Sequence, residues 1–429
     1  MSSRSSATPA VDAARATRQA RAVGHLERYA ELAVVVGTGL RPGQRLVICG
    51  EPEHAPLVRA VAEAGWRAGA SDVECVYVDD HLRRLHAIHA AEESLDRTPD
   101  WLEQAARSTE EAAFVYIVGD ADPNLFHDVD PARAARAEPL RLRKANRDLT
   151  LRLARAWTVV ACPTAGWANE VLGTPDVDRL WEEIAAVARL DADDPVAAWS
   201  EHIEALETRA AALVAADFDV VRFTGPGTEL EIGLLGAAVW KTAQSTTAWG
   251  QRHVTNLPTE EVFTTPDRGR AEGTVRLTAP LHWYGSVVEG GELRFEDGRV
   301  VEVRAKAGEE FLRSKVAADE GAARVGEVAL VDTGSAVGQR GLVFRSLLFD
   351  ENASCHIALG AGYTDPVEGA SEMSDDERVE AGINSSAIHI DMMIGGPEVD
   401  VTGVRADRTT EPIIEQGVWV LSVGEGVRN

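Results

Sequence analysis

The chain has 429 residues, and its 43 Lys and Arg against 69 Asp and Glu give a formal net charge of −26. Nucleic acid and anionic membrane surfaces are therefore poor partners, because both would repel it. The content of 45% hydrophobic and 26% charged residues is that of an ordinary globular protein. No apolar run approaches the roughly 20 residues that a membrane helix needs. The length predicts two or three domains.

The N-terminal segment and the cysteine pattern indicate in which cellular compartment the protein is expected. Residues 1–24 are rich in Ser, Ala and Arg, which predicts a flexible or helical segment and leaves a transit peptide as the alternative. The cysteines are scattered and form no Cys-x-x-Cys pair: Cys49, Cys75, Cys162 and Cys355. This pattern excludes a zinc ribbon, argues against a disulfide framework and predicts a reducing compartment, the cytoplasm.

In residues 25–200, short β-type runs alternate with amphipathic stretches. Such alternation predicts a mostly parallel sheet covered by helices, an α/β layer domain of Rossmann or flavodoxin-like type. The expected strands are 43–49, 72–78, 112–118 and 158–162, and the expected helices are 54–69, 82–91 and 101–108. Two further helices, 178–190 and 197–216, lead out of this region.

Residues 201–429 show a different pattern, in which short β-type runs are separated by glycines. Strands are expected at 219–223, 229–234 and 273–279, and a helix at 309–316. Residues 292–304 alternate on both sides of Asp297-Gly298, which is a strong hairpin signal. The second half is therefore predicted to be an α+β domain rich in antiparallel sheet, with the boundary near residue 200.

Several familiar motifs are absent or incomplete. Gly37-Thr-Gly39 and Gly225-Pro-Gly-Thr228 lack the full dinucleotide-binding pattern, and neither a phosphate loop nor a G-x-S-x-G elbow occurs. His86 and His89 lie one helical turn apart near Glu92 and Glu93, a spacing that can hold a metal. The surrounding stretch is polar and Arg-rich, so a solvated helix face is the preferred interpretation.

Asp332-Thr-Gly-Ser335 follows an apolar run and resembles the aspartic protease loop. That chemistry needs two carboxylates sharing a proton. Only one copy is present, so a monomeric aspartic protease is excluded and only a symmetric dimer could supply the second Asp. A turn that ends a strand is the preferred interpretation.

A sharper constellation lies in the second half: Glu260, Glu261, Glu327, His356, Tyr363, His389 and Asp391. His389 and Asp391 are two apart in an apolar β-type run, so both side chains leave the same strand face. Carboxylates and imidazoles in such runs are costly to bury without partners. A metal cluster is a natural partner, because it neutralises grouped carboxylates.

These segments resemble the M29 metallo-aminopeptidases, most specifically from Gly225-Pro-Gly-Thr228 onward. Looser matches lie in the first half, at Pro42-Gly-Gln44, Trp101, Asp122-Pro123 and Trp167-Ala168. The resemblance implies an α/β N-terminal domain and a C-terminal metal-binding domain. It also implies a homodimer with two divalent cations that acts on peptides with a free N-terminus.

Carried over by motif, the metal ligands are Glu261, Glu327, His356, His389 and Asp391, and Tyr363 is the active-site tyrosine. Five ligands suit a two-metal centre better than a single closed zinc site. Mixed His and carboxylate ligands fit Zn²⁺, Co²⁺ or Mn²⁺. Glu327 is the expected bridging carboxylate.

The general base is not fixed by the sequence. Glu260 is a candidate, although adjacent strand residues face opposite ways, so it is not expected to share the role of Glu261. The departures from the family pattern, at residues 332–337 and at Met392, remove no ligand. The alternatives are a metal hydrolase of another amide or ester and a non-catalytic member of the fold.

Overall fold

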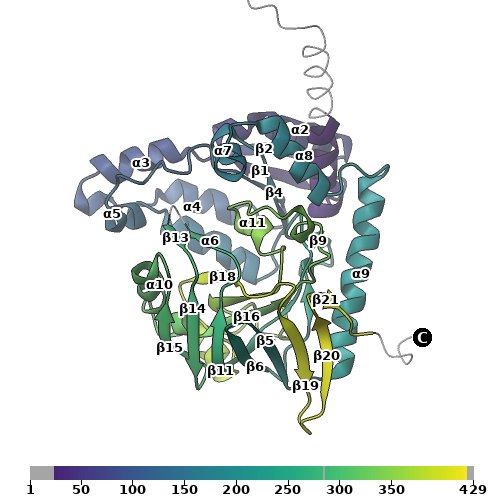
Figure 1. Cartoon of the computed structure of the whole chain (residues 1–429). Coiled ribbons are helices and arrows are strands. Elements are labelled where there is room, and N and C mark those ends of the chain that lie inside the picture. The colour runs from purple at the N-terminus through teal and green to yellow at the C-terminus, as the bar shows by residue number, and fades with distance from the viewer. Residues whose placement is uncertain (1–23, 284–285, 423–429) are drawn as a thin grey trace, which may run out of the picture.

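A computed structural model describes residues 24–283 and 286–422 of the chain. A parallel sheet with its helices lies at one end of the molecule and antiparallel sheets lie at the other, with the long helix α9 (Pro195–Ala216) running along one side (Figure 1). The predicted N-terminal segment, residues 1–24, lies almost wholly outside the described residues. None of the helices in the described ranges is both long and apolar enough to cross a membrane.

The first half contains a four-stranded, all-parallel sheet in the order β2-β1-β3-β4. Its strands are β1 (Arg45–Gly50), β2 (Asp72–Tyr77), β3 (Ala113–Val118) and β4 (Ala156–Ala161). Helix α2 (Ala55–Arg67) covers one face and buries Leu57, Val58 and Val61 against it. The predicted parallel sheet is thus confirmed.

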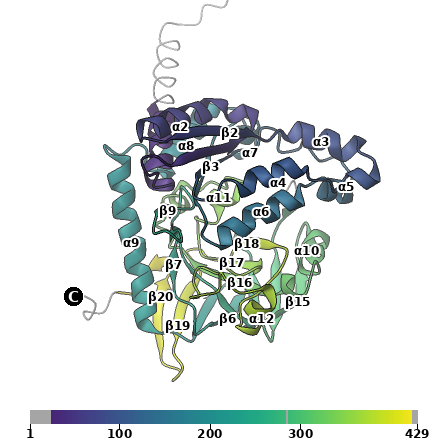
Figure 2. The same ribbon diagram turned by 180° about the vertical axis from the view of Figure 1, so that it is seen from behind.

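A helical arm projects from this sheet (Figures 1 and 2). Helices α3 (Asp80–His89) and α5 (Pro131–Arg136) enclose a small core of their own, and α4 (Asp100–Arg107) packs on α6 (Leu140–Leu151). The sequence did not predict α6, whose polar sequence LRLRKANRDLTL offers few apolar positions.

The second half contains an eight-stranded sheet and a five-stranded sheet. The larger runs β15 (Arg299–Arg304), β14 (Glu292–Glu296), β11 (Pro266–Arg276), β6 (Thr228–Leu234), β5 (Val220–Gly225), β19 (Asp400–Val404), β20 (Thr410–Glu415), β21 (Val418–Trp419). The smaller runs β18 (His389–Met393), β17 (His356–Gly360), β16 (Val325–Leu330), β10 (Val262–Thr264), β7 (Lys241–Thr242). Asp297 and Gly298 have positive φ and turn the predicted β14–β15 hairpin.

Shorter elements complete the described chain. The helices are α7 (Ala165–Leu172), α8 (Val177–Val187), α10 (Glu309–Val316), α11 (Leu347–Asp350) and α12 (Asp375–Glu380). Two hairpins pair β8 (Gln244–Thr246) with β9 (Arg252–Val254) and β12 (Leu281–Trp283) with β13 (Ser286–Val288). Brief helical turns are η1 (Ala33–Gly37), η2 (Pro52–His54), η3 (Glu92–Ser94), η4 (Gly321–Ala323) and η5 (Gly338–Arg340).

The two halves are interleaved at their junction. The Val159 amide donates to Thr255 O (2.8 Å), and the Leu257 amide donates to Val159 O (3.0 Å). Residues 255–257 thereby extend the edge of the first sheet at β4, in parallel. Helix α9 passes through residue 200 without a break, and the predicted domain boundary there stays a prediction.

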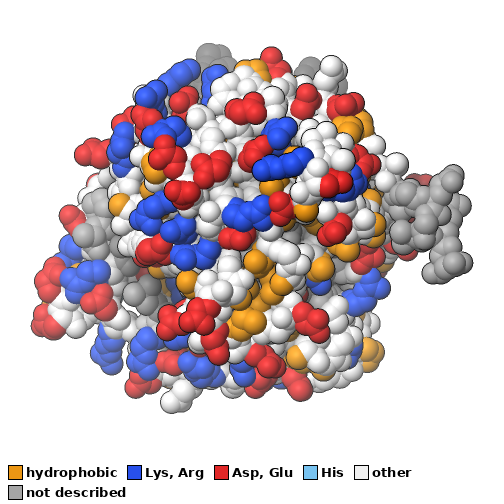
Figure 3. All heavy atoms as spheres, turned by 90° about the horizontal axis from the view of Figure 1, so that it is seen from below, with side chains coloured by type: hydrophobic (Ala, Val, Ile, Leu, Met, Phe, Trp, Pro, Cys, Tyr) orange, Lys and Arg blue, Asp and Glu red, His pale blue; other side chains and the backbone are white. Residues whose placement is uncertain are grey.

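Charges of both signs are mixed on the surface despite the net negative charge. On the face in Figure 3, Lys and Arg side chains are interspersed with Asp and Glu. Arg270, for example, pairs with Asp219, and Arg313 with Glu309.

Candidate metal centre

The register of the five-stranded sheet places the predicted ligands on one face. Glu327 on β16 lies opposite Ala358 on β17, which lies opposite Asp391 on β18. Directly paired residues of antiparallel strands share a face, as do residues two apart on one strand. His356, two before Ala358, and His389, two before Asp391, therefore point the same way.

Glu261 joins this face from the next strand. Phe263 on β10 pairs with Ala329 on β16, two residues after Glu327. Glu261 lies two residues before Phe263, just ahead of β10, so its carboxylate enters the same cluster. Every residue of β16 and β17 is buried, so both faces of this sheet are covered. A slip by one residue would turn Glu327 or His356 away from the other ligands into an apolar environment, which disfavours any other register.

The five side chains form two overlapping groups. Potential ligand atoms of Glu261, Glu327 and His356 lie within 4.8 Å of one another, and so do those of Glu327, His389 and Asp391. His356 Nε2 is 3.2 Å from Glu261 Oε2, and His389 Nε2 is 3.1 Å from Glu327 Oε2. Glu327 is the member common to both groups.

Burial makes this cluster electrostatically costly. Glu327 is 2% exposed and His356 is 1% exposed. Burial, together with the charges of Asp391 and Glu261, raises the pKa of Glu327 to about 7. Burial alone would lower the pKa of His356, but the surrounding carboxylates, Glu261 foremost, raise it to about 10. Without cations, the cluster must therefore hold extra protons.

The residues fit divalent cations. His356 Nδ1 is buried without a hydrogen-bond partner among the described residues, which is rare for native polar atoms. His389 Nε2 lies within ion-pair distance of two carboxylates, Glu327 Oε2 at 3.1 Å and Asp391 Oδ1 at 3.2 Å. Ala358 places only a methyl group between Glu327 and Asp391 on the ligand face. Imidazole and carboxylate donors at such spacing are the ligand set of zinc and related metals.

A further carboxylate, Glu351, approaches the cluster and was not singled out from the sequence. It lies at the end of α11, five residues before His356. Burial and the negative charges of Asp391 and Glu261 hold its pKa well above the usual value. No periodic pattern could have indicated it, because α11 is a single short turn. Its place in the segment Asp350-Glu351-Asn352, just ahead of a predicted ligand, was the available signal.

Tyr363 stands at the open side of the cluster. Its ring centroid is 4.9 Å from that of His389 and 5.2 Å from that of Phe263, and the residue is 43% exposed. Partial burial and the charges of Glu327 and Asp391 hold its pKa well above the usual value, so the phenol keeps its proton. Its hydroxyl has no hydrogen-bond partner in the described part of the chain.

Glu260 is not brought into the cluster. Its carboxylate accepts a hydrogen bond from Arg189 Nη2 at 2.8 Å and lies 3.5 Å from His202 Nε2. Burial raises its pKa and the Arg189 charge opposes that shift. The sequence expectation that Glu260 faces away from Glu261 agrees with this placement, which makes Glu260 a poor candidate for the general base.

The two other candidate sites, the histidine pair near Glu92 and the Asp332 loop, have ordinary partners. His86 Nε2 lies 3.3 Å from Leu95 O, and Glu92 pairs with Arg133 and Arg136. Asp332 pairs with Arg209 of α9, which is the opposite of the shared-proton pair that an aspartic protease requires.

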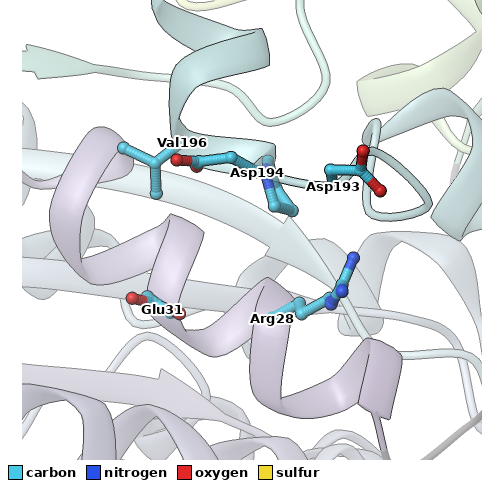
Figure 4. A pocket seen from close by; sticks show the side chains of 6 residues that line it. Arg28, Glu31, Asp193, Asp194 and Val196 are labelled. Atoms are coloured by element: carbon cyan, nitrogen blue, oxygen red, sulfur yellow. The ribbon is translucent and has the colours of Figure 1, made fainter.

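A separate surface cavity, of about 350 Å³, lies between the first described helix and the start of α9 (Figure 4). Arg28, Glu31, Asp193, Asp194, Pro195 and Val196 line it. None of the predicted site residues contributes, and Arg28 already donates to Leu190 O and Ala192 O. This cavity has no connection with the metal cluster.

Comparison with known proteins agrees with this geometry. A family described as thermophilic metalloprotease (M29) matches residues 23–419. Aminopeptidase T of Thermus thermophilus is 42% identical over 92% of this chain and 98% of its own length. Aminopeptidase 2 of Geobacillus stearothermophilus is 38% identical over 93% of this chain and 98% of its own.

The fold is shared as well. The solved structure of wild-type AmpT from Thermus thermophilus superposes with a TM-score of 0.85 at 40% identity, covering 92% of this chain and 99% of that one. The predicted family is confirmed, and the aspartic protease alternative is excluded. The chain therefore belongs to the M29 metalloprotease family and is a metal-dependent aminopeptidase.

Proposed function

We propose that the enzyme releases N-terminal residues from peptides with two divalent cations held by Glu261, Glu327, His356, His389 and Asp391. The observation that carries this proposal is the position of Glu327 in both ligand groups. Because Glu327 has two carboxylate oxygens and belongs to both groups, it would be the residue that holds both cations. Zn²⁺, Co²⁺ and Mn²⁺ all suit this donor set.

Side chains of the protein are proposed to transfer the protons and to stabilise the transition state. A bound cation pair supplies Lewis acidity and lowers the pKa of a water. Glu351 is the proposed general base, because its carboxylate lies close enough to Glu261, Asp391 and His356 to interact electrostatically with all three. It takes the proton of the attacking water and returns it to the amine that leaves.

Tyr363 is the proposed hydrogen-bond donor to the oxygen that becomes negative in the transition state. Its free, protonated hydroxyl at the open side of the cluster supports this role. The substrate's free α-amine approaches a carboxylate-rich site, which favours an ammonium or a cation-bound amine over a blocked N-terminus. Exopeptidase action follows from that preference.

Assembly and location belong to the same proposal. A homodimer follows from the family resemblance. The described cysteines, Cys49, Cys75, Cys162 and Cys355, are all unpaired, which supports a reducing compartment, the cytoplasm.

The test is hydrolysis of a panel of aminoacyl-p-nitroanilides and short peptides, with matched N-acetylated peptides, before and after chelation and add-back of each metal. We expect turnover only of free N-termini, lost on chelation and restored by metal, with two cations per chain by elemental analysis. Equal turnover of N-acetylated substrates would contradict an aminopeptidase and favour a hydrolase of other amides. One cation per chain at full activity would contradict the bridging role of Glu327.

A further inference from the structure

The segment 255–261, which leads into the metal centre, is fixed by both halves of the molecule. Val159 of β4 bonds both flanks of Asn256, through Thr255 O (2.8 Å) and the Leu257 amide (3.0 Å). The Tyr29 hydroxyl donates to Leu257 O at 2.6 Å. The backbone on either side of Asn256 is therefore held by the first-half sheet, which fixes the position from which the Asn256 side chain extends.

That side chain reaches the proposed general base. Asn256 Nδ2 donates to Glu351 Oε1 at 3.2 Å. No other residue in the described ranges donates a hydrogen bond to the Glu351 carboxylate. Helix α11, which ends at Asp350 directly before Glu351, lies between the two halves in both views (Figures 1 and 2).

This hydrogen bond gives the Glu351 carboxylate a defined orientation. A directed N–H on one carboxylate oxygen fixes that oxygen and leaves the second oxygen for a water. The residue after Glu351 is tied to the same segment through its side chain, since Asn352 Oδ1 accepts from the Glu260 amide at 2.7 Å.

We propose that Asn256 is a positioning residue, through which the first-half parallel sheet sets the orientation of the Glu351 carboxylate at the metal centre. This inference rests on the proposed function, and specifically on Glu351 as the base. It gives the first half a part in catalysis without any contact between that sheet and the substrate.

The test compares Asn256→Ala, Asn256→Asp and Asn256→Gln with wild type. Asn124→Ala, an exposed loop asparagine of the first half, is the matched control. Steady-state kinetics on an aminoacyl-p-nitroanilide are combined with metal content and melting temperature. We expect Asn256→Ala to lower kcat by about 10- to 100-fold, as does the loss of other hydrogen-bond partners that orient a catalytic group, with KM within about twofold and metal content unchanged. Asn256→Gln keeps an amide and should fall between Asn256→Ala and wild type.

The isosteric change decides between positioning and packing. Asn256→Asp preserves shape but replaces the donor by an anion beside Glu351, so its kcat should fall below that of Asn256→Ala. In a Glu351→Gln background, Asn256→Ala should change kcat by less than about twofold, because residues that act as one unit are not additive.

The outcomes that overturn the inference are distinct from failure of the proposed function. Asn256→Asp activity equal to or above that of Asn256→Ala would mean that only packing matters, and so would an unaltered Asn256→Ala effect in the Glu351→Gln background. Loss of metal from the Asn256 variants would mean that the residue supports the ligands rather than the base. Absence of chelator-sensitive turnover in wild type would instead remove the proposed function itself.

Discussion

Two regions of this molecule gather histidines and carboxylates, and they are built differently. In the helical arm, His86, Glu92 and their neighbours lie near the surface, and Arg133 and Arg136 pair with Glu92. In the five-stranded sheet, Glu261, Glu327 and Asp391 are buried, and no Lys or Arg of the described chain forms an ion pair with them.

The contrast shows which property marks a metal site. Both regions have the residue types and local spacing that bind metals, so composition alone does not separate them. In the arm, arginines pair with the acidic residues at the surface, where both charges stay hydrated and no metal ion is needed to neutralise them. The centre keeps buried carboxylates that no Lys or Arg of the described residues neutralises, and such a charge needs an external cation or extra protons.

Removal of a ligand should break the centre. Glu327→Ala and His356→Ala should each lower kcat/KM by more than about 10³-fold, because the metal-supported chemistry is lost. Elemental analysis should show fewer cations per chain, while circular dichroism shows a folded protein. Near-wild-type turnover by either variant would mean that the centre lies elsewhere.

Tyr363→Phe should leave the cations in place and weaken only the transition state. Loss of one donor to a developing oxyanion costs on the order of 10²-fold in kcat. Kinetics at saturating substrate, with metal content measured in parallel, check this expectation. A rise in KM with unchanged kcat would instead make Tyr363 a substrate-binding group.

Metal affinity should fall as the pH falls. The pKa of metal-free His356 is about 10 and that of Glu327 is about 7, so binding must displace a proton from His356 below pH 10 and a second from Glu327 below pH 7. Each displaced proton weakens apparent affinity by about tenfold per pH unit. Competition with a calibrated chelator between pH 6 and 8 measures this slope, and a flat profile would contradict it.

Glu260→Gln should affect stability more than catalysis. The change weakens the bond to Arg189, a loss of about 1–3 kcal/mol for a buried charged partner. We expect a lower melting temperature and a kcat within about tenfold of wild type. If kcat collapsed while stability and metal content held, Glu260 would regain its place as a catalytic candidate.

His86→Ala should be nearly silent in activity and metal content, because surface substitutions usually change stability by less than about 0.5 kcal/mol. The same assays as for Glu327→Ala provide the comparison. A large loss of activity here would mean that the arm, rather than the sheet, holds the functional metal.

Much of the fold was accessible from local sequence. Helix α10 occupies the predicted residues 309–316, and the hairpin turns at Asp297-Gly298 as expected, because periodicity and turn chemistry are local properties. Helix α6 was missed because most of its residues are polar. The ligand assignment drew on the family resemblance, and among its residues only His389 and Asp391 shared a face by spacing alone.

The sequence by itself therefore determined part of the secondary structure, the family and the residue types of the centre. Only the tertiary structure decided which carboxylates meet. It brought Glu351 to the cluster, turned Glu260 toward Arg189, and added residues 255–257 to the edge of a sheet about 100 positions earlier in the chain. The physical reason is that long-range backbone pairing and buried charge depend on partners distant in sequence, which no local period encodes.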